Sequence, residues 1–129
     1  MPKLNQLTTD FQKALANFRE VLKEAKSDII RDSAIKRYEL LFDLSWKTLK
    51  DYLEVNFGVV VNSPIPCFRE AFRQGIFEYD ETWITLVKTR NYTVHAYNEA
   101  LAEKVYTQLP VYLPYFEKLE KIFTASLRV

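Results

Sequence analysis

Apolar side chains recur at intervals of three and four along most of the chain, which predicts helices. Over residues 4–26 they form one stripe on an amphipathic helix: Leu4, Leu7, Phe11, Leu15, Phe18, Leu22 and Ala25. A helix repeats every 3.6 residues, so this spacing places these side chains on one face. Lysine and glutamate fill the other side.

A second helix is expected over residues 28–57, with Ser27 or Asp28 as its N-cap and Gly58 just past its end. Its apolar positions keep the helical period, and Leu40 and Leu44 add apolar surface on another face. A helix that is apolar on more than one side lies either at the centre of a bundle or at a subunit interface.

A loop and a short helix follow. The stretch "VVVNSPIP" at 59–66 is expected to be a loop, because Pro64 and Pro66 prevent a long strand. Asn62 or Ser63 can cap a short helix over about 64–74, and Gly75 can close it.

Residues 81–97 allow two interpretations. They are rich in Thr, Val, Tyr and Trp, which favour strands. Their apolar and motif positions nevertheless recur at three and four: Trp83, Leu86, Val87, Arg90, Val94 and Tyr97. We expect a helix capped by Asp80, because a lone strand would have no partner to pair with.

The last helical segment is expected over 98–127, with a kink or break near 109–114 where Pro110 and Pro114 each remove a backbone donor. The sequence therefore predicts an all-α fold: an antiparallel up-and-down helical bundle of four long helices plus one short helix. Residues 1–129 are expected to form a single domain.

Composition narrows the function classes. The 129 residues are 48% hydrophobic and 27% charged, as in a soluble globular protein, and the net charge of +1 does not indicate a general nucleic-acid binder. The single cysteine, Cys67, excludes an internal disulfide and is expected to be a buried hydrophobe. No signal peptide or membrane span is expected, so the predicted location is the cytoplasm.

The candidate chemistry is concentrated in "KTRNYTVHAYNEA", residues 88–100, which holds the only histidine. On a helix, Arg90 and Tyr97 would lie nearly on one line, with Asn91 and His95 on the next, all on one polar face. Arginine can hold a phosphate with two hydrogen bonds, and histidine can move a proton near neutral pH. Together they could cleave RNA without metal.

That interpretation has limits. One histidine cannot serve as both acid and base, although a symmetric dimer would supply two. A histidine beside an arginine on a helix is more often a surface or satisfied core residue, and Tyr97 alone would be a packing aromatic.

Other polar groups give weaker signals. Glu39 and Asp43 form an acidic pair that is usually a solvated face, and the basic residues Lys36, Arg37, Lys47 and Lys50 are expected to be ordinary surface. No phosphate-binding loop, paired-cysteine spacing or nucleophile elbow occurs, so no cofactor and no metal are expected.

The motif also carries a resemblance. "RNYTVH" resembles the R-x4-H signature of HEPN domains (higher eukaryotes and prokaryotes nucleotide-binding), in its R-N-x3-H form, and "RNYTVHAY" resembles R-x4-H-x-Y of HEPN proteins paired with a minimal nucleotidyltransferase. "RYELLFDLSWKTLKDYLE" and "PIPCFREAFRQGIF" are similar to segments of nucleotidyltransferase substrate-binding proteins. The resemblance covers about residues 4–125.

The resemblance implies a homodimeric HEPN toxin, a metal-independent endoribonuclease acting on RNA. Arg90 and His95 would be catalytic and Asn91 supporting. A cognate minimal nucleotidyltransferase antitoxin would neutralise it, in some such pairs by transferring AMP to the motif tyrosine, here Tyr97. The alternative implied by the older family description is a non-catalytic subunit that binds a nucleotide or other substrate for its nucleotidyltransferase partner. A purely structural helical dimer is a third hypothesis.

Overall fold

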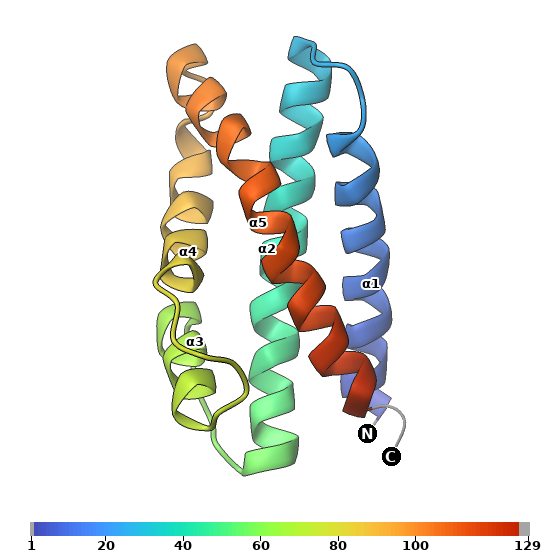
Figure 1. Cartoon of the computed structure of the whole chain (residues 1–129), viewed down its shortest axis with the longest axis vertical. Coiled ribbons are helices and arrows are strands. Elements are labelled where there is room, and N and C mark those ends of the chain that lie inside the picture. The colour runs from blue at the N-terminus through green and yellow to red at the C-terminus, as the bar shows by residue number, and fades with distance from the viewer. Residues whose placement is uncertain (1, 127–129) are drawn as a thin grey trace.

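The computed structural model describes residues 2–126 as an antiparallel helical bundle (Figure 1). The all-α bundle expected from the sequence is confirmed, and no strand occurs in the described residues. The elements are α1 Pro2–Leu22, α2 Asp28–Phe57, α3 Pro64–Arg73, α4 Thr82–Tyr92, the 3₁₀ helix η1 Thr93–His95 and α5 Glu99–Ser126.

Helix α2 is the centre of the bundle. It packs against α1, α3, α4 and α5, and Figure 1 shows α1 on one side, α3 and α4 end to end on the other, and α5 crossing obliquely over the face. Central packing explains its main apolar stripe, but Leu40 of the expected second apolar face is 52% exposed. Tyr38 is fully buried on this helix and donates its hydroxyl to the carbonyl of Leu86 in α4, at 2.6 Å.

The helix ends follow the expected capping chemistry. The Ser27 hydroxyl accepts from Ile30 N at 3.1 Å, and Gly58 ends α2 in the left-handed conformation with φ 67°. The Asp80 carboxylate accepts from Thr82 N at 2.9 Å, so it caps the start of α4. Ser63 precedes α3 but makes no side-chain cap hydrogen bond.

Helix α5 runs unbroken through Pro110 and Pro114, so of the kink or break expected near 109–114 the break is wrong, and the kink stays a prediction. Both prolines lie on its exposed face. Proline has no backbone N–H, so the carbonyls of Tyr106 and Pro110, each four residues before a proline, lose their helical partner. Water can reach these carbonyls at the helix surface. Leu109, Tyr112 and Phe116 continue the buried stripe past both positions.

The core consists mainly of aromatic and aliphatic side chains from all five α-helices. Trp83 stacks on Phe77 with ring centroids 4.2 Å apart, which fixes α4 against the segment that precedes it. Cys67 is fully buried, as expected, and burial raises the pKa of its thiol to about 12. None of the helices in residues 2–126 combines the length and apolarity that crossing a membrane requires.

Candidate functional site

The last turn of α4 places Arg90 against two carboxylates of α2. Its Nε and Nη2 donate to Asp43 Oδ1 and Oδ2 at 3.1 and 3.2 Å, and its Nη1 donates to Glu39 Oε2 at 3.1 Å. Glu39 and Asp43 are four residues apart, so they lie on the same face of α2. The paired carboxylates are therefore ligands of Arg90, and the expectation of a merely solvated acidic face is wrong.

Thr93 completes this cluster from η1. It is 5% exposed, and its hydroxyl lies 2.7 Å from both Glu39 Oε2 and the carbonyl oxygen of Arg90. The same hydroxyl accepts from Arg90 Nη1 at 3.2 Å. The four residues Arg90, Glu39, Asp43 and Thr93, called here the Arg90 cluster, link α2 to the end of α4.

The carboxylates of the cluster pair with Arg90 and favour its charged form. Its pKa is raised, first by the hydrogen bond with Asp43, against an opposing effect of burial. Lys36 Nζ lies 3.9 Å from Glu39 Oε1 and adds a second positive charge. The cluster uses four of the five N–H donors of the guanidinium and leaves one Nη2–H, so a phosphate held by two hydrogen bonds would have to displace a partner of Arg90.

His95 is separated from this arrangement by a change of helix type. Helix α4 ends at Tyr92, and η1 covers 93–95, so the continuous helix expected over 81–97 is wrong at its end. A 3₁₀ helix has three residues per turn, which rotates the following side chains off the α-helical lines. Arg90 is half-buried against α2, whereas Asn91, His95 and Tyr97 are exposed.

The three remaining motif side chains all face solvent. Asn91 and His95 are exposed, and Asn91 makes no side-chain hydrogen bond within residues 2–126. Tyr97 is 84% exposed. The His95 ring meets Tyr92 and Tyr97 edge-on, with centroids 5.8 and 6.2 Å away. Val94, expected to face the core, is 64% exposed.

A surface cavity of about 250 Å³ lies beside the Arg90 cluster. It is lined by α2 and by the segment around η1: Asp32, Ile35, Lys36, Glu39, Thr93 and Ala96. Carboxylate and hydroxyl oxygens accept hydrogen bonds, and the Lys36 ammonium donates them. This lining is suited to a small polar molecule that carries hydroxyl or amino groups. Within residues 2–126, no group of three or more side chains is placed to hold a metal ion.

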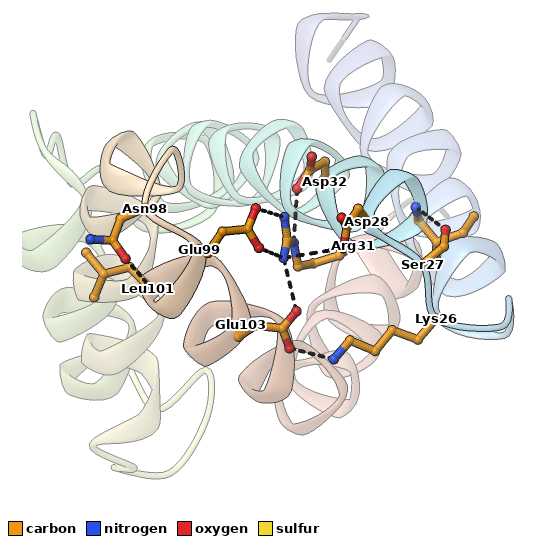
Figure 2. A network of polar contacts seen from close by, with 10 residues as sticks. Lys26, Ser27, Asp28, Arg31, Asp32, Asn98, Glu99, Leu101 and Glu103 are labelled. Atoms are coloured by element: carbon orange, nitrogen blue, oxygen red, sulfur yellow. Dashed lines mark hydrogen bonds and ion pairs between the residues drawn. The ribbon is translucent and has the colours of Figure 1, made fainter.

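A second charged network anchors the segment that follows the motif (Figure 2). Arg31, whose side chain is 4% exposed, donates from Nη1 to Glu99 Oε2 at 2.7 Å and to Glu103 Oε1 at 3.0 Å. Asn98 Oδ1 accepts from Leu101 N at 3.2 Å and so caps the start of α5. The turn that carries Tyr97 is therefore held between α2 and α5.

Sequence reasoning missed the role of Arg31. The available signal was its spacing, because Arg31 lies three residues before Ala34 and seven before Tyr38, both of which belong to the apolar stripe of α2. A charged side chain at a core position of a helix requires an ionic partner, and on a bundle that partner comes from another helix.

Comparison with known proteins places the chain in a family. Residues 6–125 match the family described as "Nucleotidyltransferase substrate binding protein like", and the chain belongs to it. A solved structure from Thermus thermophilus is 34% identical, with a TM-score of 0.82; the match covers 88% of this chain and 98% of that one.

A second solved structure agrees with the fold. HI0074 from Haemophilus influenzae, described as revealing the fold of a substrate binding domain of a nucleotidyltransferase, is 22% identical with a TM-score of 0.73. That match covers 94% of this chain and 98% of HI0074. None of the curated proteins compared with the chain matches it.

Proposed function

We propose that the protein is a non-catalytic substrate-binding subunit that works with a separate nucleotidyltransferase. The observation that carries this proposal is the occupation of Arg90 by Asp43 and Glu39 beside a polar cavity. The family to which the chain belongs supports the same function. In this proposal the bundle holds the acceptor molecule, and the partner supplies the nucleotide and the transfer chemistry.

The Arg90 cluster favours binding over RNA cleavage. Cleavage at a 2′-hydroxyl needs a base for the proton and a free cation for the developing charge on phosphorus. Arg90 is neutralised by two carboxylates, and His95 is exposed at the end of η1 with Tyr92 and Tyr97 against its ring. Neither feature supports a preformed ribonuclease centre in one chain.

The cavity beside the cluster indicates the substrate chemistry. Asp32 and Glu39 are acceptors, Lys36 is a donor, and Ile35 and Ala96 provide apolar contact. A small molecule with hydroxyl or amino groups fits this lining, because the carboxylates accept hydrogen bonds from such groups and their own charges are balanced by Arg31, Arg90 and Lys36. A hydroxyl held here would be the acceptor of the nucleotidyl group.

The proposal is tested by purifying the protein with its nucleotidyltransferase partner and measuring nucleotidyl transfer to hydroxyl- and amine-bearing acceptors. Glu39→Gln should raise the KM for the acceptor with little change in the KM for the nucleotide. The Glu54→Gln control removes a charge from an exposed position of the same helix. Transfer that is equally fast without this subunit, or unaffected by Glu39→Gln, would overturn the proposal.

The alternative function is the HEPN ribonuclease toxin, and the motif "RNYTVH" is the observation that favours it. It requires a homodimer to bring two His95 side chains together, and a two-point hold on phosphate requires Arg90 to release one of its partners; the homodimer stays a prediction. RNA integrity after expression without the partner distinguishes the two functions. RNA degradation by the native chain that is lost in both Arg90→Ala and His95→Ala would establish the ribonuclease.

A further inference from the structure

A second cavity, distinct from the one beside the Arg90 cluster, lies between α4 and α5. Its volume is about 180 Å³. It is lined by Lys88, Thr89 and Tyr92 from α4 and by Lys104, Val105 and Gln108 from α5. The described residues that line it include two ammonium groups and no carboxylate. We call it the Lys88–Lys104 cavity.

Neither of these two lysines forms an ion pair within residues 2–126. Among residues 2–126, the lysines that form ion pairs are Lys3, Lys26 and Lys36. The nearest acid in the sequence, Glu103, is held by Lys26 at 2.5 Å and by Arg31 at 3.0 Å, so its carboxylate is already occupied. Two uncompensated positive charges on neighbouring helices make the cavity selective for an anion.

The lining also includes the Thr89 hydroxyl, which is hydrogen-bonded to a tyrosine of α5. Thr89 Oγ1 lies 2.7 Å from the hydroxyl of Tyr112, which is 2% exposed. Two hydroxyls that share one hydrogen bond use only one of their two O–H hydrogens, so one remains for another acceptor. The Gln108 amide provides further donors at the same wall.

The remaining lining is apolar or aromatic. Val105 and the Tyr92 ring offer the kind of surface that packs against a flat ring, and Tyr92 is 49% exposed. Sites for drug-sized ligands occupy about 300–1,000 Å³. The smaller volume here suits a single ring with one anionic group.

We propose that the Lys88–Lys104 cavity binds a small anion that carries one flat ring, such as an aryl phosphate. The anionic group lies between the two lysines and accepts from Thr89 or Gln108, while the ring packs against Tyr92 and Val105. The inference does not rest on the nucleotidyltransferase partner, because every contact comes from this chain.

Phenyl phosphate is the probe, and its binding to the purified full chain is measured by titration calorimetry. Inorganic phosphate tests the charge alone and phenol the ring alone, and AMP tests whether a nucleotide is the source of the same chemistry. We expect saturable binding of phenyl phosphate and weaker binding of phosphate, phenol and the larger AMP.

The decisive comparison is between two double variants. Lys88→Gln with Lys104→Gln should weaken phenyl phosphate binding by about tenfold or more, because two charge-assisted contacts are lost. Lys13→Gln with Lys121→Gln removes the same charge from exposed positions on α1 and α5 and should leave the affinity unchanged. All four lysines are exposed, and circular dichroism checks that both variants stay folded.

Three results would overturn the proposal. The first is no measurable binding of phenyl phosphate, whether or not AMP binds. The second is an equal loss of affinity in both double variants, which would indicate a general effect of net charge. The third is binding of inorganic phosphate as tight as that of phenyl phosphate, which would remove the role of the ring.

Discussion

Arg90 and Asp43 form a two-point ion pair across the α2–α4 contact, with Nε to Oδ1 at 3.1 Å and Nη2 to Oδ2 at 3.2 Å. The pair joins a motif residue to an acidic residue 47 positions earlier in the chain. It fixes the guanidinium plane and holds the arginine against α2. The proposed function and the first prediction both depend on this geometry.

Asp43→Asn should lower the free energy of unfolding by about 0.5–1.5 kcal/mol, because the ion pair with Arg90 is lost. The partial solvent exposure of this ion pair limits the stability that it contributes. Urea denaturation measures the change. In a double-mutant cycle with Arg90→Gln, the two losses should not add, since the residues interact directly. Glu54→Gln is the control. Losses of Asp43→Asn and Arg90→Gln that add in the double variant would contradict the pairing.

Stability at low pH should depend on Arg31. The hydrogen bond from Arg31 lowers the pKa of Glu99, and hydrogen bonds from Lys26 and then Arg31 lower that of Glu103. A carboxyl whose pKa is lower in the folded than in the unfolded chain stabilises the protein at pH values above the ordinary carboxyl pKa of 4.5. This contribution is lost as the pH falls through the pKa of the folded state. Native stability should therefore decrease from about pH 5 downward.

Urea midpoints at several pH values test this dependence. Arg31→Met should be less stable than the native chain near neutral pH, and the difference should shrink as the pH falls. The control Arg73→Met removes a charge from a pair whose arginine is 79% exposed, and its curve should parallel the native one. A constant difference for Arg31→Met across the whole range would contradict the role of Glu99 and Glu103.

Pro110→Ala and Pro114→Ala should each stabilise the protein. Each change restores a backbone donor inside a continuous helix. It also increases the entropy of the unfolded chain, which offsets part of the gain. We expect a net gain of about 1–2 kcal/mol in the free energy of unfolding. Pro66→Ala in the first turn of α3 is the control and should give no gain, because the donor there has no helical acceptor. Equal effects at all three positions would contradict this explanation.

Tyr97 is proposed as a residue modified by the partner. Its side chain is 84% exposed in the turn before α5, so its hydroxyl is open to a second protein. In the reaction the phenolic oxygen would bond to the α-phosphorus of ATP, pyrophosphate would leave, and the phenol proton would pass to solvent. Mass spectrometry after co-expression with the nucleotidyltransferase should find one or more AMP units on the peptide that contains Tyr97.

Tyr92 serves as the internal control for this experiment, because it is also exposed and also contacts His95. Tyr97→Phe should abolish the added mass, and Tyr92→Phe should retain it. An unmodified Tyr97 in an active complex would exclude this residue as the acceptor.

The sequence by itself determined the helices and most of their ends. The stripe from Leu4 to Phe18, the Ser27 cap and the left-handed Gly58 are local features, and their physical causes act within a few residues. The sequence also placed Arg90, Asn91, His95 and Tyr97 in one short segment. The end of α4 could not be predicted in the same way, because Thr and Val residues at 93–94 are compatible with several backbone conformations.

Only the tertiary structure decided how the motif is arranged. The switch to 3₁₀ geometry at Thr93 is stabilised by the contact of its hydroxyl with Glu39, which lies 54 residues away in the sequence. The carboxylates that join Arg90 to α2 and Arg31 to α5 are likewise 47 to 72 residues distant in the sequence. Periodicity identifies the face on which a charged side chain lies, but the packing of one helix against another selects the carboxylate it meets, because ion pairing is set by distance in space.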